Sequence, residues 1–201
     1  TTTKMMRPQE QEIFAAYEQT WQQRAIPDTA SGWRECRTAE KKWKEQVQSI
    51  LDTYGCCVAG SLIPGTEKFG MLPEKLMEDL LYLADEILIE ADGSAHMPVK
   101  APAEHEPVLF PYMDEVVIVM GAHAIGKPLM EVCHRVDYAK ELLKCDADKI
   151  VTAADIETLA EQGYAIPIQK QFPWMKISKV TGKDIKLCLT AEKKDKVRDK
   201  Q

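Results

Sequence analysis

Hydrophobic residues recur at helical spacing in three segments of the first half of the chain. The spacing predicts a helix over residues 8–24, a second over residues 39–53 that ends at Gly55, and a third that begins near Pro73. Residues 26–37 contain proline, glycine and serine, so we expect a loop there. The side chains expected to face the core are Ile13, Phe14, Tyr17, Trp21, Trp43, Val47, Ile50, Leu51, Tyr54, Leu76, Leu80 and Leu81.

Short, continuously apolar runs alternate with these helices. Residues 56–60, 86–91 and 116–121 each have the length and composition of a buried strand. Two further strands are predicted over residues 175–180 and 185–189. Because the central runs are continuous, the pattern predicts an α/β fold, with a mainly parallel sheet that carries helices on both faces.

A later helix is predicted from Thr152 to just before Gly163. Thr152 and Asp155 have the spacing of a capping box, and the glycine is placed to end the helix. We therefore divide the chain into an α/β core over residues 1–163 and a C-terminal segment over residues 164–201, whose charged end is expected to fray.

The charge and composition of the chain argue against nucleic-acid binding, membrane insertion and secretion. The net charge is −6, so a broad basic field for nucleic acid or an anionic membrane is not expected. The chain has neither a run of about 20 apolar residues, as a membrane span requires, nor a secretory leader. Its six cysteines form no C-x-x-C pair and fit reduced, buried thiols of a cytoplasmic protein. Because the chain starts at Thr1 with no strand before it, we expect it to begin inside a larger protein.

Two carboxylates and a glycine follow the predicted strand over residues 86–91. Glu90, Asp92 and Gly93 would lie at the carboxyl edge of a parallel sheet, where ligands bind. Carboxylates at this edge can hold Mg²⁺, directly or through water, and the glycine lets the backbone approach a phosphate. The alternative is a simple turn.

The next segment, residues 98–111, holds four prolines and several charges. It is expected to form an irregular surface loop that presents Lys100, Glu104 and His105. Restricted backbone positions side chains at a low entropic cost, so a binding role competes with that of an ordinary solvated loop.

Glycines and a lysine follow the predicted strand over residues 116–121. Gly121, Gly126 and Lys127 can cradle an anion, although their spacing is not that of a P-loop. Further along, His134 and Arg135 are two cationic candidates next to Cys133, which is either a reactive thiol or a buried core residue.

The first residues of the chain are also polar. Thr2, Thr3 and Lys4 have the chemistry to bind phosphate, and the Thr3 hydroxyl can ligate Mg²⁺. The alternative is a flexible polar terminus.

These segments, taken in order, resemble one family. The residues that carry the resemblance are Thr1-Thr2-Thr3-Lys4-Met5, Val58-Ala59-Gly60-Ser61-Leu62, Gly65 to Met71, Glu90-Ala91-Asp92-Gly93, Pro98-Val99-Lys100-Ala101-Pro102, Glu104-His105-Glu106-Pro107-Val108, Gly121 to Leu129 and His134-Arg135. The series is similar to the YqeC-like accessory proteins of selenium-dependent molybdenum hydroxylases. It extends to about Val151 and fades after Gly163.

The resemblance implies a P-loop NTPase-like protein. In that family a glycine-rich phosphate-binding loop stands upstream of the Thr-Thr-Thr-Lys segment, so the N-terminal strand and this loop would be missing here. Asp92, helped by Glu90 and Thr3, would organise Mg²⁺ with ATP or GTP, while Lys100, His105 and Arg135 would contact phosphates or the molybdenum cofactor. The implied role is maturation of the hydroxylase, with the hydroxylase or its cofactor-maturation proteins as partners.

The sequence departs from the family pattern at two places that bear on these roles. His123 stands where family members commonly have Asp, and Cys133 stands where valine is expected. Two alternatives therefore remain: a non-hydrolytic carrier or scaffold that binds molybdenum cofactor or a selenium donor, with Cys133 or the pair Cys56 and Cys57 as carrier thiols, and a structural subunit of the hydroxylase. The sequence does not specify the nucleotide or the oligomeric state.

Overall fold

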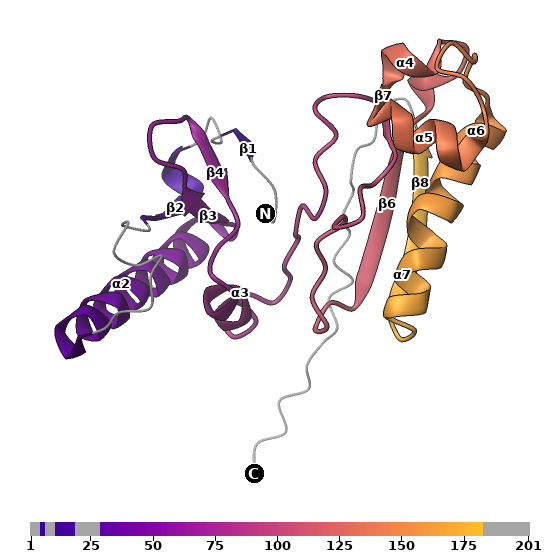
Figure 1. The fold of residues 1–201 in the computed structure, drawn as a ribbon. Helices are drawn as coiled ribbons and strands as arrows, with labels where there is room; N and C mark the ends of the chain where they lie inside the picture. The colour runs from indigo at the N-terminus through magenta and orange to yellow at the C-terminus, as the bar shows by residue number, and fades with distance from the viewer. Residues whose placement is uncertain (1–4, 7–10, 19–28, 183–201) are drawn as a thin grey trace. The chain divides into compact units, whose positions relative to one another are not determined.

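The computed structural model of the protein describes residues 5–6, 11–18 and 29–182. The chain divides into two compact units, the first made of Thr1–His96 with Pro102–Pro111, the second of Met97–Ala101 with Tyr112–Gln201 (Figure 1). Within the described residues, no helix is long and apolar enough to cross a membrane.

The first unit contains a mixed four-stranded sheet in the order β1 (Met5–Met6), β4 (Lys68–Gly70), β3 (Val58–Leu62), β2 (Phe14–Tyr17). β2 and β3 are parallel, whereas β4 runs antiparallel to both β1 and β3. The predicted strand over residues 56–60 is thus confirmed with a shift of two residues.

The helix predicted over residues 8–24 is wrong where the structure describes it. Residues Gln11–Ile13 form a short 3-10 turn, η1, and β2 follows directly. Phe14 and Tyr17 are buried as expected, but their burial comes from the sheet: the Phe14 ring lies 5.0 Å from that of Phe69. Pairing with β3 overrides the local helical spacing here. Trp21 lies outside the described residues.

Helix α2 (Ala30–Tyr54) is longer than the helix predicted over residues 39–53, so the predicted loop over residues 26–37 is wrong from Ala30 onward. Thr29 caps its first turn by accepting a hydrogen bond from the Gly32 N–H at 3.2 Å, a signal that the loop-like composition obscured. The helix ends at Gly55 as predicted, with φ 73° and an N–H bond to the Leu51 carbonyl.

The hydrophobic stripe of α2 packs on β2. Trp43, Val47 and Ile50 are buried, and the Trp43 indole donates to the Ala15 carbonyl at 3.2 Å. These three residues therefore join the helix to the sheet, as their spacing predicts, whereas Tyr54, expected on the same stripe, is 50% exposed at the end of the helix.

Helix α3 (Glu74–Leu80) follows Pro73, which is the residue before its first turn, as predicted. Ion pairs join α2 to α3, from Lys44 to Asp79 at 2.9 Å and from Lys75 to Glu40 at 2.8 Å. Leu76 and Leu80 are buried, but Leu81 follows the helix and is exposed, contrary to expectation.

The strand predicted over residues 86–91 does not form. These residues are irregular, and Leu88 in their centre is 62% exposed. The Ala91 carbonyl accepts a hydrogen bond from the Val108 N–H at 3.1 Å, which is a contact between two loops and not part of a sheet ladder. An apolar run becomes a strand only where a partner strand pairs with it, and the run alone does not encode that partner.

The second unit is built on two parallel strand pairs. β6 (Glu115–Gly121) pairs with β8 (Lys176–Gly182) over its whole length, and β5 (Val99–Lys100) pairs with β7 (Cys133–His134). The strands predicted over residues 116–121 and 175–180 are therefore confirmed, and residues 185–189 lie outside the described residues. The segment over residues 98–111 is irregular, as predicted, except for β5.

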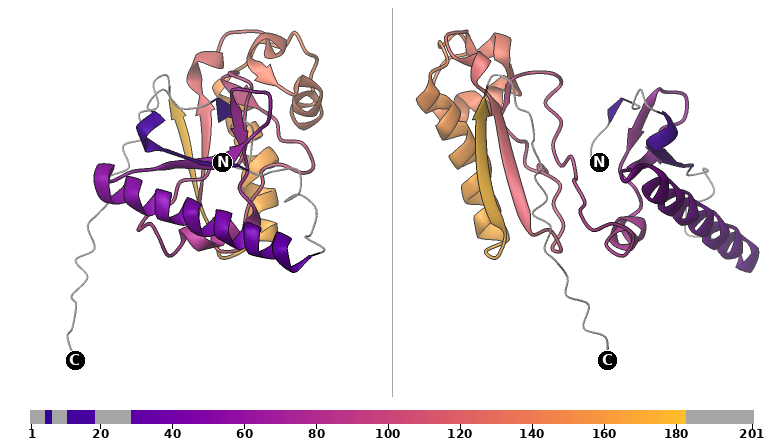
Figure 2. Two further views of the ribbon diagram at one scale, coloured as in Figure 1. Left: turned by 90° about the vertical axis from the view of Figure 1, so that its left-hand side faces the viewer. Right: turned by 180° about the vertical axis from the view of Figure 1, so that it is seen from behind.

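Helices occupy the rest of this unit: η2 (Ala122–Ala124), α4 (Leu129–Val132), α5 (Val136–Leu143), α6 (Ala153–Thr158), the π-helix η3 (Leu159–Ala165) and α7 (Ile166–Gln171). The run from α6 to α7 lies along one face of the β6–β8 pair (Figure 2). Gly163 does not end the helix as predicted, because it lies inside the π-helical turn and the chain continues helically.

The fold class is confirmed at the level of helices combined with small sheets. Three strand pairs are parallel, but the described strands form three separate sheets and two antiparallel pairings. A single parallel sheet with helices on both faces, and the P-loop NTPase-like arrangement, stay predictions.

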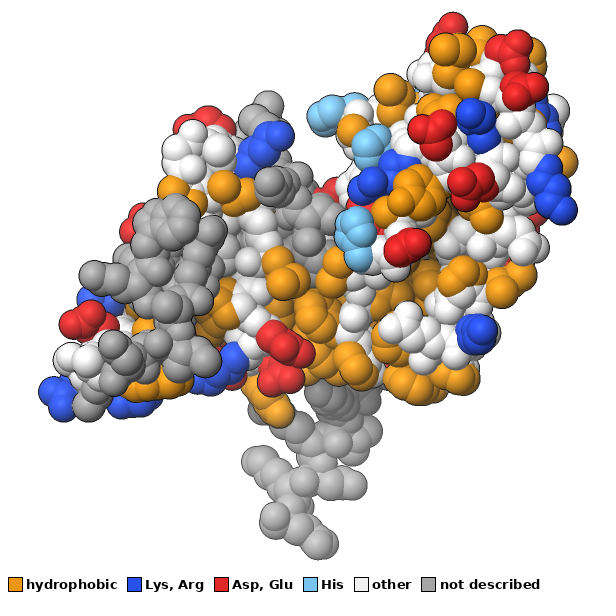
Figure 3. All heavy atoms as spheres, in the orientation of Figure 1, with side chains coloured by type: hydrophobic (Ala, Val, Ile, Leu, Met, Phe, Trp, Pro, Cys, Tyr) orange, Lys and Arg blue, Asp and Glu red, His pale blue; other side chains and the backbone are white. Residues whose placement is uncertain are grey.

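On the face drawn in Figure 3, acidic, basic and hydrophobic side chains are mixed over α4, α5 and α6.

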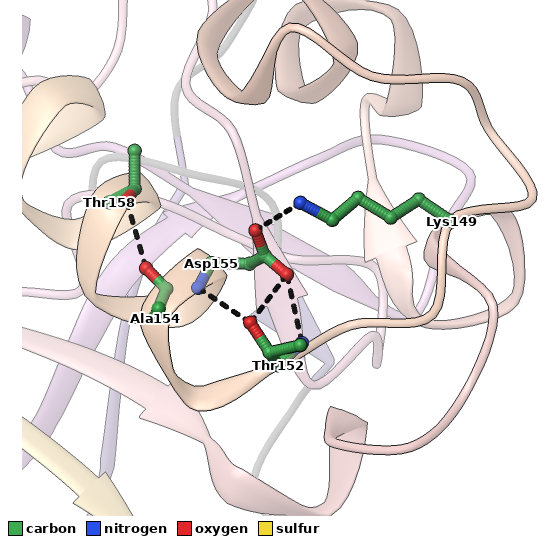
Figure 4. A network of polar contacts seen from close by, with 5 residues as sticks. All are labelled: Lys149, Thr152, Ala154, Asp155 and Thr158. Atoms are coloured by element: carbon green, nitrogen blue, oxygen red, sulfur yellow. Dashed lines mark hydrogen bonds and ion pairs between the residues drawn. The ribbon is translucent and has the colours of Figure 1, made fainter.

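The capping box at the start of α6 is confirmed and is extended by a lysine (Figure 4). The Thr152 N–H and hydroxyl donate to Asp155 Oδ2 at 2.9 and 2.7 Å, and Lys149 Nζ donates to Oδ1 at 2.6 Å. Burial acts to raise the pKa of Asp155, but the bonds from Lys149 and Thr152 outweigh it and hold this pKa below its ordinary value.

Candidate functional site

The parallel pairing of β5 with β7 brings three predicted site residues together in the second unit. Lys100 stands directly opposite His134, and Arg135 is the next residue of the chain. Paired residues of neighbouring strands point their side chains to the same face of the sheet. We call Lys100, His134 and Arg135 the basic cluster.

The opposite face of this strand pair packs into the core. Val99 and Cys133 are opposite each other and almost fully buried. The Ala101 N–H donates to the His134 carbonyl at 3.2 Å and continues the pairing beyond the two strands. The basic cluster therefore stands on a fixed backbone, which lowers the entropic cost of holding a ligand.

Lys100 is only 4% exposed, which is rare for a lysine. Lys100, His134 and Arg135 all take part in further interactions within the protein. A buried ammonium group is tolerated where polar or charged partners compensate its lost hydration. Such a group provides a positive charge that solvent screens weakly, which is the property an anion site needs.

Arg135 adopts a left-handed conformation, with φ 63° and ψ 57°. This conformation is unusual for a residue other than glycine, and such residues concentrate at functional sites. It turns the chain from β7 directly into α5, so the positive end of that helix follows the basic cluster.

The carboxyl end of β6 meets the start of β5 at Gly121. The Gly121 N–H donates to the Pro98 carbonyl at 2.7 Å. A Cβ atom at Gly121 would lie 2.8 Å from Pro98 Cβ and 2.8 Å from His123 Cε1, closer than real side chains approach. The position therefore requires glycine for a close approach of backbone and side chains, not for a positive φ.

The loop after β6 uses its N–H groups internally. Gly126, with φ 84°, donates to the Val151 carbonyl at 2.9 Å, and the Lys127 N–H donates to the Ala124 carbonyl at 3.2 Å. A contribution of this loop to anion binding would thus come from the exposed Lys127 side chain rather than from these two backbone groups.

The other predicted site residues belong to the first unit or lie outside the description. Glu90 is exposed, Asp92 and Gly93 are half-buried, and all three are in the irregular segment rather than at a strand end. Glu104 and His105 are exposed in a turn, which the Glu106 carboxylate closes by accepting from the Ala103 N–H at 3.1 Å. Thr2, Thr3 and Lys4 lie outside the described residues.

The Mg²⁺ site on Asp92, Glu90 and Thr3 stays a prediction. The described residues hold no group of three or more His, Cys, Asp or Glu side chains placed for a metal ion. Mg²⁺, however, keeps several waters and is commonly held by one or two carboxylates with substrate phosphates.

The cysteines bear on the carrier alternative. Burial raises the pKa of the Cys133 thiol to about 11, and its Sγ donates to the His134 carbonyl at 3.4 Å. Burial also raises the pKa of Cys57, whereas Cys56 is exposed. A carrier thiol needs exposure and a low pKa, so Cys133 lacks both properties.

Sequence reasoning named each member of the basic cluster but not their pairing. Lys100 and His134 are far apart in the chain, and neither carries a local signal for the other. It also missed the close approach of Pro98 and of His123 to Gly121, for which the local sign is a glycine at a strand end.

Together, these features define an α/β protein with a structured basic cluster beside a parallel strand pair. The sequence model of the YqeC protein matches residues 1–137, and the chain belongs to this family. A 76-residue stretch is 41% identical to the uncharacterized protein YqeC of Escherichia coli strain K12, and covers 37% of this chain and 30% of that protein. No solved structure matches the chain.

Proposed function

We propose that this protein is a nucleotide-dependent accessory factor for the maturation of selenium-dependent molybdenum hydroxylases, and that the basic cluster holds the phosphate groups of its ligand. The observation that carries the proposal is the register of β5 and β7, which aligns buried Lys100 with His134 immediately before Arg135. The accessory role itself is supported by the family resemblance.

The three side chains suit different parts of a phosphate. Lys100 supplies a point charge in a poorly screened environment, and Arg135 offers a planar fork that can donate two parallel hydrogen bonds to phosphate oxygens. The His134 imidazole can add a third donor. Because the positive end of α5 follows Arg135, it favours negative charge at the same place.

As a separate part of the proposal, Asp92, with help from Glu90 and Thr3, would hold the Mg²⁺ ion that accompanies the nucleotide. When bound, the ion would neutralise charge on the phosphate oxygens. A nucleotide and the molybdenum cofactor both present phosphate, so the basic cluster fits either ligand. A cytoplasmic location is part of this proposal and fits the free cysteines.

Two variants with one control test the role of the cluster. Mg-ATP and Mg-GTP are titrated calorimetrically into the wild-type chain, Arg135→Lys and Lys100→Met, with Lys170→Met as the control because Lys170 is an exposed lysine of α7. The control should bind like the wild type. Arg135→Lys should weaken binding about tenfold, since it keeps the charge but loses the two-pronged contact.

The titration is repeated with a chain extended upstream by the phosphate-binding loop that the resemblance implies. Tighter binding by the extended chain, with the same loss in Arg135→Lys, supports the nucleotide-dependent reading. If neither chain binds either nucleotide, or if both variants bind as the wild type does, the proposal is wrong.

The Cys133 thiol does not support the carrier alternative, because it is buried. Exposed Cys56 is the remaining candidate thiol. Capture of a selenium donor that is lost in Cys56→Ser would favour a carrier over a nucleotide-dependent factor.

A further inference from the structure

The end of β6 places a further polar side chain, that of His123, near the start of β5. His123 Cε1 and Pro98 Cβ both lie 2.8 Å from the point where Gly121 would carry a Cβ atom. Because both atoms lie 2.8 Å from the same point, His123 Cε1 and Pro98 Cβ can be at most about twice 2.8 Å apart. The absence of a side chain at Gly121 is what allows the imidazole to fold back toward the start of β5.

Pro98 connects this contact to the ligand-binding face. It lies directly before β5 and precedes Lys100 by two residues. Lys100 shares that face with His134 across the β5–β7 pair. The His123 ring thus lies near the start of the strand that carries Lys100.

The local structure holds the backbone of His123 while leaving its ring accessible. The Gly121 N–H is bound to the Pro98 carbonyl, and the Ile125 N–H is bound to the Ala122 carbonyl, on either side of this residue. His123 itself is exposed. An imidazole that is positioned by its backbone and open to solvent can exchange water for a ligand at a small conformational cost.

We propose that His123 is a ligand-contacting residue that makes the basic cluster selective for a terminal phosphate group, as in a phosphate monoester or a nucleotide. This inference rests on the proposed function, because it needs the cluster to bind phosphate. A terminal phosphate exposes three oxygens, one more than a phosphodiester. Lys100 and Arg135 take two directions of approach, and the His123 ring donates to the third oxygen.

The experiment follows the His123 ring signal by NMR in histidine-labelled protein while inorganic phosphate, glycerol 3-phosphate or Mg-ATP is added, with sodium chloride at equal ionic strength as the reference. The chain has four histidines, and His123→Gln assigns the signal. His96→Ala is the matched control, because His96 is an exposed histidine of the first unit. A dialkyl phosphate tests the selectivity.

We expect the His123 signal to shift with all three terminal phosphates, and the dialkyl phosphate to leave it unchanged. His123→Ala should weaken phosphate binding about tenfold, a loss of ~1.4 kcal/mol, and His123→Gln should recover part of it because the amide keeps a donor. Gly121→Ala should act like His123→Ala, since its methyl group occupies the place of the ring. A response to Mg-ATP alone would identify a nucleotide as the source of the phosphate and would contradict the general phosphate selectivity proposed here.

The possible failures are distinguishable. If phosphate binds and the Arg135→Lys variant weakens it, but the His123 signal and the His123→Ala affinity do not change, the inference about His123 is wrong while the basic cluster stands. If no phosphate compound binds either the wild-type chain or the chain extended upstream, the proposed function is wrong and the inference about His123 is wrong with it.

Discussion

Replacing Asp155 by Asn tests how firmly the helical run of the second unit is anchored. The Asp155 carboxylate accepts from Lys149 Nζ at 2.6 Å, from the Thr152 N–H at 2.9 Å and from the Thr152 hydroxyl at 2.7 Å. An amide keeps a single acceptor oxygen, so its NH₂ group must face one of these donors. The variant keeps the size of the side chain and changes its charge and hydrogen bonding.

The cost follows from the burial of this side chain, which is 9% exposed. Hydrogen bonds to charged groups contribute about 1.5–3 kcal/mol, and a buried donor left without its acceptor costs a similar amount. We therefore expect Asp155→Asn to lower the free energy of local unfolding by about 2 kcal/mol. In hydrogen exchange, this loss corresponds to about thirtyfold faster exchange of the amides in α6 and η3.

The effect should also depend on pH. The pKa of Asp155 is lower in the folded than in the unfolded chain, so the unfolded chain binds more protons in acid. The carboxylate stabilises the fold above its unfolded pKa of about 4, and this contribution disappears as pH falls through the folded pKa. The difference in stability between wild type and Asp155→Asn should thus be largest near neutral pH and shrink below about pH 4.

Hydrogen exchange read by mass spectrometry resolves the peptides of this helical run. Thr158→Ala is the matched control, because it removes a hydroxyl bond to the Ala154 carbonyl on the exposed side of the same helix (Figure 4). The control should change exchange little. Equal protection in Asp155→Asn and wild type at neutral pH would refute the argument that this carboxylate anchors the run.

Three further predictions concern individual contacts. In the native protein, Cys56 should react with iodoacetamide while Cys133 does not, as mass spectrometry can show; labelling of Cys133 before unfolding would contradict its burial and raised pKa. Gly55→Ala should destabilise the first unit by about 1 kcal/mol in urea unfolding, because its φ of 73° strains any side chain; an unchanged midpoint would contradict this. Lys44→Met should cost less than ~1 kcal/mol and the cost should fade in high salt, since the pair with Asp79 is partly exposed; a larger loss that salt does not change would be inconsistent with a screened pair.

Local signals predicted the apolar face and the end of α2 and the start of α6. The stripe of Trp43, Val47 and Ile50 specified the face of α2, and Gly55 specified its end. Thr152 and Asp155 specified the start of α6. At Gly55 and at Thr152 the stabilising contacts join residues within four positions of one another, so the information is contained in a short stretch of sequence. The stripe of α2 was predictable for another reason: its periodicity shows which face is apolar, although its contacts are with β2.

Two predictions failed because strand formation depends on pairing between segments that are distant in the sequence. Residues Phe14 and Tyr17 have helical spacing, yet they form a strand because β3 lies beside them. Residues 86–91 are as apolar as a strand, yet they form none. The difference between the two lies in the availability of a partner strand, which neither stretch encodes.

The site shows the same division. The chemistry of Lys100, His134 and Arg135 was readable as charge on particular residues, and the resemblance to the family gave their order. Lys100 is buried and stands opposite His134 because β5 pairs with β7. No local sequence pattern specifies this pairing. The carboxylates Glu90 and Asp92 were expected at a strand end, and the structure keeps them on an irregular segment instead.

The most direct test of the central claim is a map of backbone amide NMR shifts as Mg-nucleotide is added to the protein. The account predicts the largest changes at β5, at β7 and at the start of α5, with Lys100, His134 and Arg135 among them. Saturable changes confined to α2 or to the sheet of the first unit would contradict the assignment of the basic cluster as the phosphate site.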